Sequence, residues 1–162
     1  MIMIRNITAN DFYFIYSLYM HPQVNPFLLY ENMDAQSFEP IFNDLLEKNI
    51  IYVFEADGVA VGMFKFIPQL YRTAHVAYLG GLAIDPSCAG KGYGLQMMNE
   101  IIVLGKQMSI LRIELGVDVI NAKAIHLYEK AGFAKEGILR KYTWLKTENR
   151  FLDEYMMSYL YQ

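Results

Sequence analysis

The chain has 162 residues, of which 54% are hydrophobic, and its net charge is −3 at pH 7 with histidine neutral. This length is typical of one domain, so we expect a single domain over residues 1–162, and the apolar content excludes a disordered chain. Because basic residues are not in excess, nucleic acid is not expected as a partner.

The cysteine and histidine content argues against a metal centre. Cys88 is the only cysteine, which excludes an intrachain disulfide and a paired-cysteine metal site, and the three histidines show no ligand spacing. The N-terminal residues become polar too soon for a signal peptide, and no apolar run approaches the length of a membrane span. We therefore expect a cytoplasmic protein that holds no metal and has no membrane as a partner.

The N-terminal part of the chain is expected to form one strand and two helices. A short strand over residues 2–7 is followed by Thr8 and Asp11, whose spacing is that of a helix capping box. Apolar residues at helical spacing predict a first helix that ends before Pro22 and a second helix that follows Asp34.

The periodicity then changes from helix to strand. Two β-rich runs, residues 50–55 and 59–67, are joined by an Asp-Gly turn that is typical of a β-hairpin. A third run, residues 74–84, ends close to a proline, which cannot continue a strand ladder. Residues 23–33, between the two predicted helices, lack periodicity and are expected to form a loop.

The C-terminal half is expected to alternate helices and strands. In chain order these are a helix over residues 95–108, a strand over 111–117, a helix over 122–131 that closes at Gly132, and strands over 133–143 and 151–160. The inward-facing set of the first of these strands is Leu111, Ile113, Leu115 and Val117. The whole order predicts an α/β fold with a mixed, mostly antiparallel sheet of six to seven strands and helices on both faces.

A glycine loop lies between the third run and the helix that follows it. Gly90, Gly92 and Gly94 allow a tight turn with exposed backbone amides, and the helix adds unpaired amides and a positive dipole end. Lys91 adds a positive charge. The spacing fits neither a P-loop nor a dinucleotide fingerprint, which leaves an anion-binding site or a plain strand-to-helix turn.

Two separated motifs carry a family resemblance. Residues 82–86, read with the glycine loop at 90–95, resemble the central motif of the GNAT superfamily of acetyl-CoA-dependent N-acetyltransferases. Residues 121–133 resemble that family's second signature, Asn-x-x-Ala-x-x-Leu-Tyr-x-x-x-Gly-Phe, and residues 136–140 and 150–156 resemble the tail of members that acetylate protein N-termini and polyamines. The resemblance implies a GNAT-like fold, a single acetyltransferase domain and acetyl-CoA as its co-substrate.

The resemblance also implies a role for each matching residue. The backbone of Leu82, Ala83 and Ile84 would pair with the pantetheine arm like an added strand. Asn121 would hydrogen-bond the pantetheine, and Tyr128 would lie beside the thioester sulfur as the catalytic general acid. The pyrophosphate would be held by the backbone amides of Gly90, Lys91, Gly92, Tyr93, Gly94 and Leu95.

Two positions depart from the family pattern. Ala89 stands where the family usually has Gln or Arg, so one phosphate contact is absent, and residues 75–81 carry no carboxylate to act as general base. The expected acceptor-binding residues are Glu31, an acid that with Asp34 would attract a cationic amine, and Tyr78, an aromatic residue at a position that in this family often shapes the acceptor pocket. Either of them, or solvent, would receive the proton of the amine through a water molecule.

The expected reaction is direct transfer of the acetyl group of acetyl-CoA onto a primary amine, which is a small amine, a polyamine or a protein N-terminus. The alternative is a degenerate member that binds acetyl-CoA without turnover and acts as a sensor or partner module. The final predicted strand is rich in aromatic residues. It is a candidate for pairing across a homodimer.

Overall fold

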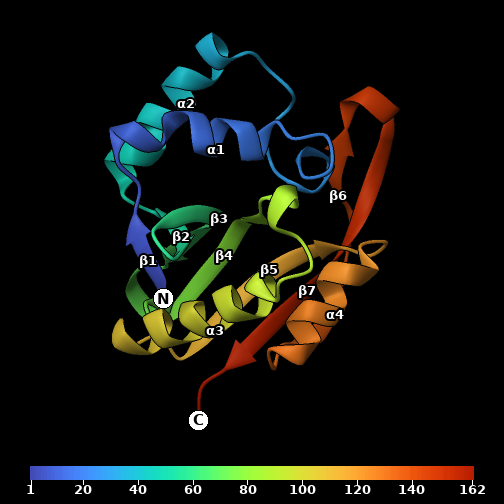
Figure 1. The fold of residues 1–162 in the computed structure, drawn as a ribbon. Helices are drawn as coiled ribbons and strands as arrows, with labels where there is room; N and C mark the ends of the chain where they lie inside the picture. The colour runs from blue at the N-terminus through green and yellow to red at the C-terminus, as the bar shows by residue number, and fades with distance from the viewer. The chain divides into compact units, whose positions relative to one another are not determined.

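The computed structural model describes the whole chain, residues 1–162, as seven strands and four α-helices with short 3-10 helices between them (Figure 1). The strands are β1 (Ile2–Asn6), β2 (Ile51–Ala56), β3 (Val59–Pro68), β4 (Val76–Ile84), β5 (Arg112–Asp118), β6 (Ala134–Leu145) and β7 (Arg150–Leu160). The helices are α1 (Phe12–Tyr19), α2 (Ala35–Lys48), α3 (Tyr93–Gln107) and α4 (Ala122–Lys130). The predicted order of strands and helices is confirmed.

One open, mixed sheet contains all seven strands in the order β1-β2-β3-β4-β5-β7-β6. The β4–β5 pair is parallel, whereas the β1–β2, β2–β3, β5–β7 and β6–β7 pairs are antiparallel. Parallel neighbours need a long crossover connection, and α3 lies in the connection between β4 and β5. The prediction of a mixed, mostly antiparallel sheet in an α/β fold is confirmed.

The chain divides into two compact units, each made of two separate segments. The first unit comprises residues 1–66 and 80–93, and the second comprises residues 67–79 and 94–162. Strand β4 begins in the second unit and ends in the first. Residues 76–79 of the strand belong to the second unit and residues 80–84 to the first.

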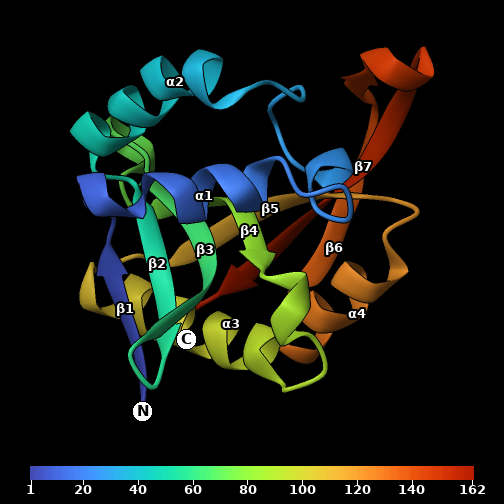
Figure 2. The same cartoon turned by 45° about the horizontal axis from the view of Figure 1, so that its top comes forward.

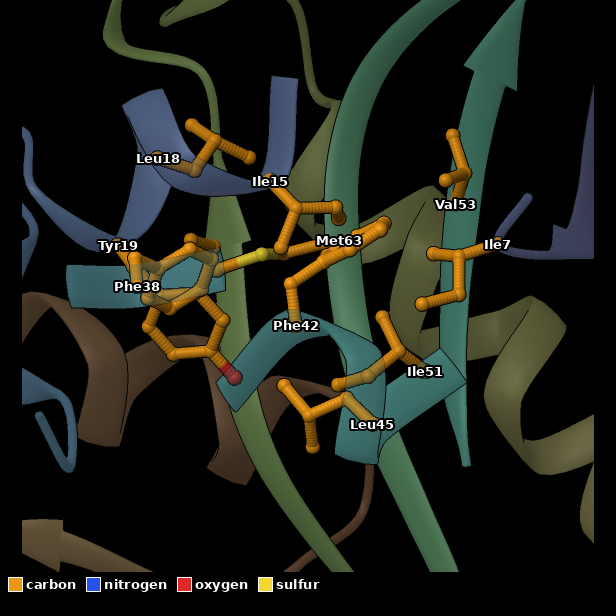
Figure 3. Packing of buried hydrophobic residues seen from close by; sticks show 11 residues of the cluster. Ile7, Ile15, Leu18, Tyr19, Phe38, Phe42, Leu45, Ile51, Val53 and Met63 are labelled. Carbon is orange, nitrogen blue, oxygen red and sulfur yellow. The ribbon is translucent and has the colours of Figure 1, made fainter. Parts of the chain in front are cut away.

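In the first unit, α1 and α2 pack on strands β2 and β3 (Figure 2). Ile15 and Tyr19 of α1, Phe38 of α2, and Ile51 and Met63 of the strands are all fully buried in this core (Figure 3). Burial of a large apolar side chain contributes roughly 1.5–3 kcal/mol. The helical spacing of the sequence therefore identified the face by which each helix is held to the sheet.

The two helices of the first unit begin where the sequence indicated. The Asp11 carboxylate accepts a hydrogen bond from the Thr8 backbone amide at 2.7 Å, and the Asp34 carboxylate accepts one from the Ser37 amide at 2.8 Å. Arg5 of β1 also pairs with Asp11 at 2.8 Å. These contacts pair amides near the helix starts and tie the beginning of α1 to the sheet.

A buried asparagine orders the loop at residues 23–33. The Asn25 side-chain amide donates hydrogen bonds to the backbone oxygens of Tyr19 at 2.8 Å and Tyr30 at 2.9 Å. The Asn32 side chain donates to Asn25 Oδ1 at 3.1 Å. This network holds the ring of Tyr30 against that of Tyr19, with centroids 4.9 Å apart. The loop is thus a built part of the first unit.

The hairpin between β2 and β3 has the predicted turn. Asp57 and Gly58 both have positive φ, 51° and 78°, which is the backbone that a two-residue type I′ turn requires. The turn sets the pairing of the two strands, with Ala56 opposite Val59.

In the second unit, β5 shows the alternation that the sequence predicted, with one exception. Ile113, Leu115 and Val117 are buried. Leu111 is 57% exposed, so its predicted inward orientation is wrong; it precedes the strand, which begins at Arg112, and is not held by the pleat.

Strand β7 lies between β5 and β6 in the second unit. It pairs with β5 on one side and with β6 on the other, and β6 is the edge strand. Because the backbone groups of β7 are already paired on both sides, the expectation that β7 pairs across a homodimer is wrong. Strands β6 and β7 form the long hairpin at the orange-to-red end of the chain in Figure 2.

Helices α3 and α4 of the second unit differ slightly from their predicted bounds. Helix α3 begins at Tyr93, so residues expected in the glycine loop belong to its first turn. Helix α4 is followed by Gly132, whose φ of 103° confirms the predicted glycine at the helix end. None of the helices is long and apolar enough to cross a membrane.

Candidate active site

The last part of β4, in the first unit, carries the three residues expected to pair with pantetheine. Leu82 and Ile84 are partly buried and Ala83 is buried. Immediately before them, Gly81 has a φ of 54°, which L side chains rarely adopt. A Cβ at this position would lie 2.7 Å from the hydroxyl oxygen of Tyr19. Glycine therefore fits this bend, which directly precedes the predicted cofactor-binding strand.

The glycine loop of the first unit has open space beside two of its glycines. Gly90 and Gly92 have φ values of 81° and 76°, and nothing lies within 4 Å of a Cβ built at either position. Lys91 between them is exposed. The ring of Tyr93 packs on Phe54, with centroids 6.2 Å apart. The loop has the conformation and the space that an anion held by backbone amides needs.

The start of α3, in the second unit, uses its glycine differently. A Cβ at Gly94 would lie 3.3 Å from Leu127 Cδ2 of α4. Gly94 is thus small because α3 and α4 pack closely, whereas Gly90 and Gly92 are glycines because of their backbone conformation. Leu95 is partly buried in the first turn of the helix. The sequence did not distinguish these two reasons for glycine.

Helix α4 positions the two residues of the second motif. Asn121 caps the helix, because its Oδ1 accepts a hydrogen bond from the Ala124 amide at 3.3 Å. Tyr128 is buried at 8% exposure and packs against Phe133 with centroids 6.2 Å apart. Burial, and to a smaller degree Tyr78, raises the pKa of the Tyr128 hydroxyl well above its usual range. Tyr128 therefore stays protonated at neutral pH, as a proton donor must.

Tyr78 of β4 interacts electrostatically with Tyr128 and with Glu154, a carboxylate that the sequence did not point to. Burial raises the pKa of Tyr78, and the charges of Glu154 and Tyr142 raise it further. Tyr78 is therefore protonated at neutral pH and cannot itself be a general base, although its hydroxyl can relay a proton. Glu154 of β7 is the carboxylate that this arrangement offers in place of one on β4.

The carboxylate of Glu154 lies against Gly116 of β5, where the missing side chain leaves room for it. Its Oε1 lies 2.5 Å from the position that a Cβ would occupy at Gly116, and its Oε2 accepts a hydrogen bond from the Thr143 hydroxyl at 2.6 Å. The signal for this residue in the sequence is weak, because Glu154 falls on an unspecified position of the 150–156 tail pattern. Only the strand register brings Glu154, Gly116 and Thr143 together.

The acidic residues expected to attract an acceptor lie in the first unit. Glu31 is exposed in the loop before α2. Asp34 is occupied as the cap of α2, and the backbone amide of Ser37 lowers the pKa of its carboxyl. Asp34 therefore has a structural role. For Glu31, binding of the acceptor stays a prediction.

The sequence matches known proteins over most of its length. Residues 2–133 match the acetyltransferase (GNAT) family. The L-amino acid N-acetyltransferase AaaT of Escherichia coli strain K12 is 36% identical over 104 residues, which are 63% of this chain and 62% of that relative, less than two thirds of its length. The spermidine N(1)-acetyltransferase of Vibrio cholerae is 29% identical over 147 residues, which are 84% of this chain and 80% of the relative.

The fold also matches solved structures. A crystal structure of spermidine N-acetyltransferase from Vibrio cholerae in complex with CoA and spermine is similar, with a TM-score of 0.84 at 24% sequence identity, over 98% of this chain and 95% of that one. Acetyl-CoA is the co-substrate of the family that residues 2–133 match. The chain, with its GNAT-like fold and both family motifs in place, belongs to the GNAT family of acetyltransferases.

Proposed function

We propose that this chain is a single acetyltransferase domain that moves the acetyl group of acetyl-CoA directly onto a primary amine. The observation that carries the proposal is the buried, protonated hydroxyl of Tyr128, on the helix that Asn121 caps. The two residues are about two helical turns apart on nearly the same face. One can therefore hold an extended thioester while the other donates a proton to its sulfur.

The backbone of the chain fits acetyl-CoA. The positive φ of Gly90 and Gly92 and the open space at both residues leave room for a diphosphate, and the start of α3 adds helix amides. The backbone of residues 82–84 and the side chain of Asn121 would hold the pantetheine. When bound, acetyl-CoA supplies a thioester carbonyl that is reactive toward an amine.

The chain's own residues would move two protons. Glu154 accepts the proton that the amine nitrogen loses as the new N–C bond forms, either directly or through Tyr78 or water. A strand amide near Leu82 stabilises negative charge on the carbonyl oxygen. Tyr128 gives its proton to the sulfur as the C–S bond breaks and regains one from solvent.

Replacing Gly92 with valine is expected to weaken acetyl-CoA binding at least tenfold, about 1.4 kcal/mol. The φ of 76° at Gly92 is unfavourable for a side chain, and the branched side chain would fill the open space that we assign to the diphosphate. Isothermal titration calorimetry with acetyl-CoA measures the effect.

Gly58→Val is the matched control for this prediction. Gly58 has a φ of 78° and equally open space, but it lies in the β2–β3 turn. Both variants should lose stability through the same backbone strain, whereas only Gly92→Val should lose acetyl-CoA affinity. Equal affinities in the two folded variants would show that the glycine loop does not hold the diphosphate.

The acceptor is proposed to be a small amine, a polyamine or a protein N-terminus. Relatives that act on an L-amino acid and on spermidine support an amine acceptor. Release of the CoA thiol is expected with at least one member of a panel that contains L-amino acids, spermidine and an N-terminal peptide. Turnover only with hydroxyl acceptors would contradict the proposal, and acetyl-CoA binding without release would support the degenerate sensor instead.

A further inference from the structure

Lys65 is a buried cation in the first unit. It lies on β3 opposite Ile51 of β2 and is only 7% exposed. Because side chains alternate along a strand, Lys65 shares a face with Met63, which belongs to the core packed by α1 and α2. Its ammonium group forms no ion pair and no hydrogen bond in the structure. A lysine is almost never this buried without a partner.

The groups around Lys65 do not supply a counter-ion. Its Nζ lies 5.5 Å from the ring centroid of Tyr30, a cation–π contact. Lys48 of α2 is the charged neighbour that acts on it, and Asp44 of that helix is already paired with Lys48 at 2.9 Å. Burial lowers the pKa of Lys65, and the positive charge of Lys48 lowers it further. Desolvating an ammonium, even in part, is costly unless an anion compensates it.

Lys65 lies next to the bend that precedes the predicted cofactor strand. A Cβ at Gly81 would lie 3.6 Å from the Cβ of Lys65, and Gly81 is followed directly by Leu82. The proposed function puts the reacting carbonyl near the strand amide at Leu82. The Asn25 network fixes Tyr30, whose ring contacts the ammonium of Lys65. The lysine without a counter-ion is therefore held in a built environment of the first unit, beside the strand residues that we propose to bind the thioester.

We propose that Lys65 binds the carboxylate of the acceptor, so that the acceptor is a small amine that also carries a carboxylate, such as an α-amino acid. The inference rests on the proposed function and narrows its acceptor class. A carboxylate would supply the missing counter-ion and accept a charge-assisted hydrogen bond from the ammonium. A polyamine would instead bring additional positive charge toward Lys65, which is unfavourable.

The test compares acceptors that differ only in their carboxylate. CoA release is measured with the twenty L-amino acids and with their carboxamides, for the wild-type chain, Lys65→Met and Lys48→Met. The wild type is expected to prefer the best amino acid over its amide at least tenfold in kcat/KM. Lys65→Met should lose at least tenfold on the acid and less than twofold on the amide. Lys48→Met, which removes an exposed charge of the same unit, should keep the preference.

A second measurement does not depend on activity. Because methionine is close in shape to the lysine stem and carries no charge, Lys65→Met should raise the Tm of the free protein. Addition of the preferred amino acid to the CoA-bound protein should raise the Tm of the wild type further and leave that of the CoA-bound variant unchanged. An unaltered acid-to-amide preference in a folded Lys65→Met protein would overturn the proposal. An equal loss on acid and amide would also overturn it and would assign Lys65 to proton transfer or structure.

The outcomes also separate this inference from the proposed function. Acetylation of spermidine without acetylation of any amino acid would overturn the role of Lys65 and leave the acetyltransferase intact. Absence of CoA release with every amine, including spermidine, would count against the proposed function itself.

Discussion

Tyr128→Phe is expected to lower kcat on the order of 100-fold, the typical loss when a general acid is removed. Phenylalanine keeps the buried ring and its contact with Phe133 but deletes the proton. A leaving thiolate with a pKa near the free-cysteine value of about 8.5 benefits from a donor, and Tyr128 remains a donor because burial raises its pKa. Folding and acetyl-CoA affinity should change little.

Single-turnover kinetics, in which chemistry limits the rate, measure the effect. Tyr159→Phe is the matched control, because Tyr159 also packs on Phe133, with centroids 5.6 Å apart, but it has no proposed role. An unchanged kcat in Tyr128→Phe would make Tyr128 a packing residue, and a loss confined to KM would make it a binding contact. Because the pKa of Tyr128 is raised, its ionisation should not lower activity up to about pH 10.

Glu154→Gln is expected to lower kcat/KM by about 10²-fold at neutral pH, within the range for a lost general base. The nitrogen proton becomes strongly acidic once the N–C bond forms, so a carboxylate is a sufficient acceptor. Glutamine keeps the size of the side chain and an oxygen that can accept from the Thr143 hydroxyl, but it cannot take the proton.

The pH dependence separates proton transfer from packing at this position. In Glu154→Gln the loss should shrink as pH rises, because hydroxide from solvent can then remove the nitrogen proton in place of the carboxylate. A structural defect would persist at every pH. Glu148→Gln is the control, since Glu148 belongs to the same hairpin and pairs with Arg150 at 3.1 Å in an exposed position. If Glu154→Gln keeps the wild-type kcat/KM, then solvent and not Glu154 removes the proton of the amine.

The order of strands and helices was predictable because each element carries a local signal. Helical spacing marked the buried face of α1 and α2, and Asp11 and Asp34 marked where these helices begin. The Asp-Gly turn required a positive φ that few other residue pairs accept. These signals act between near neighbours in the chain, so no tertiary structure was needed to interpret them.

The motif residues were equally accessible from the sequence. The glycine loop and the Asn121–Tyr128 helix are each contiguous, and their chemistry depends on backbone conformation and helical spacing. The predicted start of α3 was too late, since Tyr93 and Gly94, like Leu95, belong to its first turn. A helix start depends on how its first turn packs, and here Gly94 packs against Leu127.

Only the tertiary structure identified Glu154 and Lys65 as candidates. Glu154 acquires its position from the register of β7 on β5 and β6 and from the room that Gly116 leaves, which involve residues far apart in the sequence. Lys65 interrupts an apolar strand and would pass as a surface residue, yet it is 7% exposed beneath a loop ordered by Asn25. The position of β7 inside the sheet likewise removed the predicted dimer edge. The sequence by itself determined the elements, the family motifs and the glycine loop, because these depend on local patterns. Burial and charge pairing depend on what the fold brings together, and they decide which side chains are candidates to contact the acceptor.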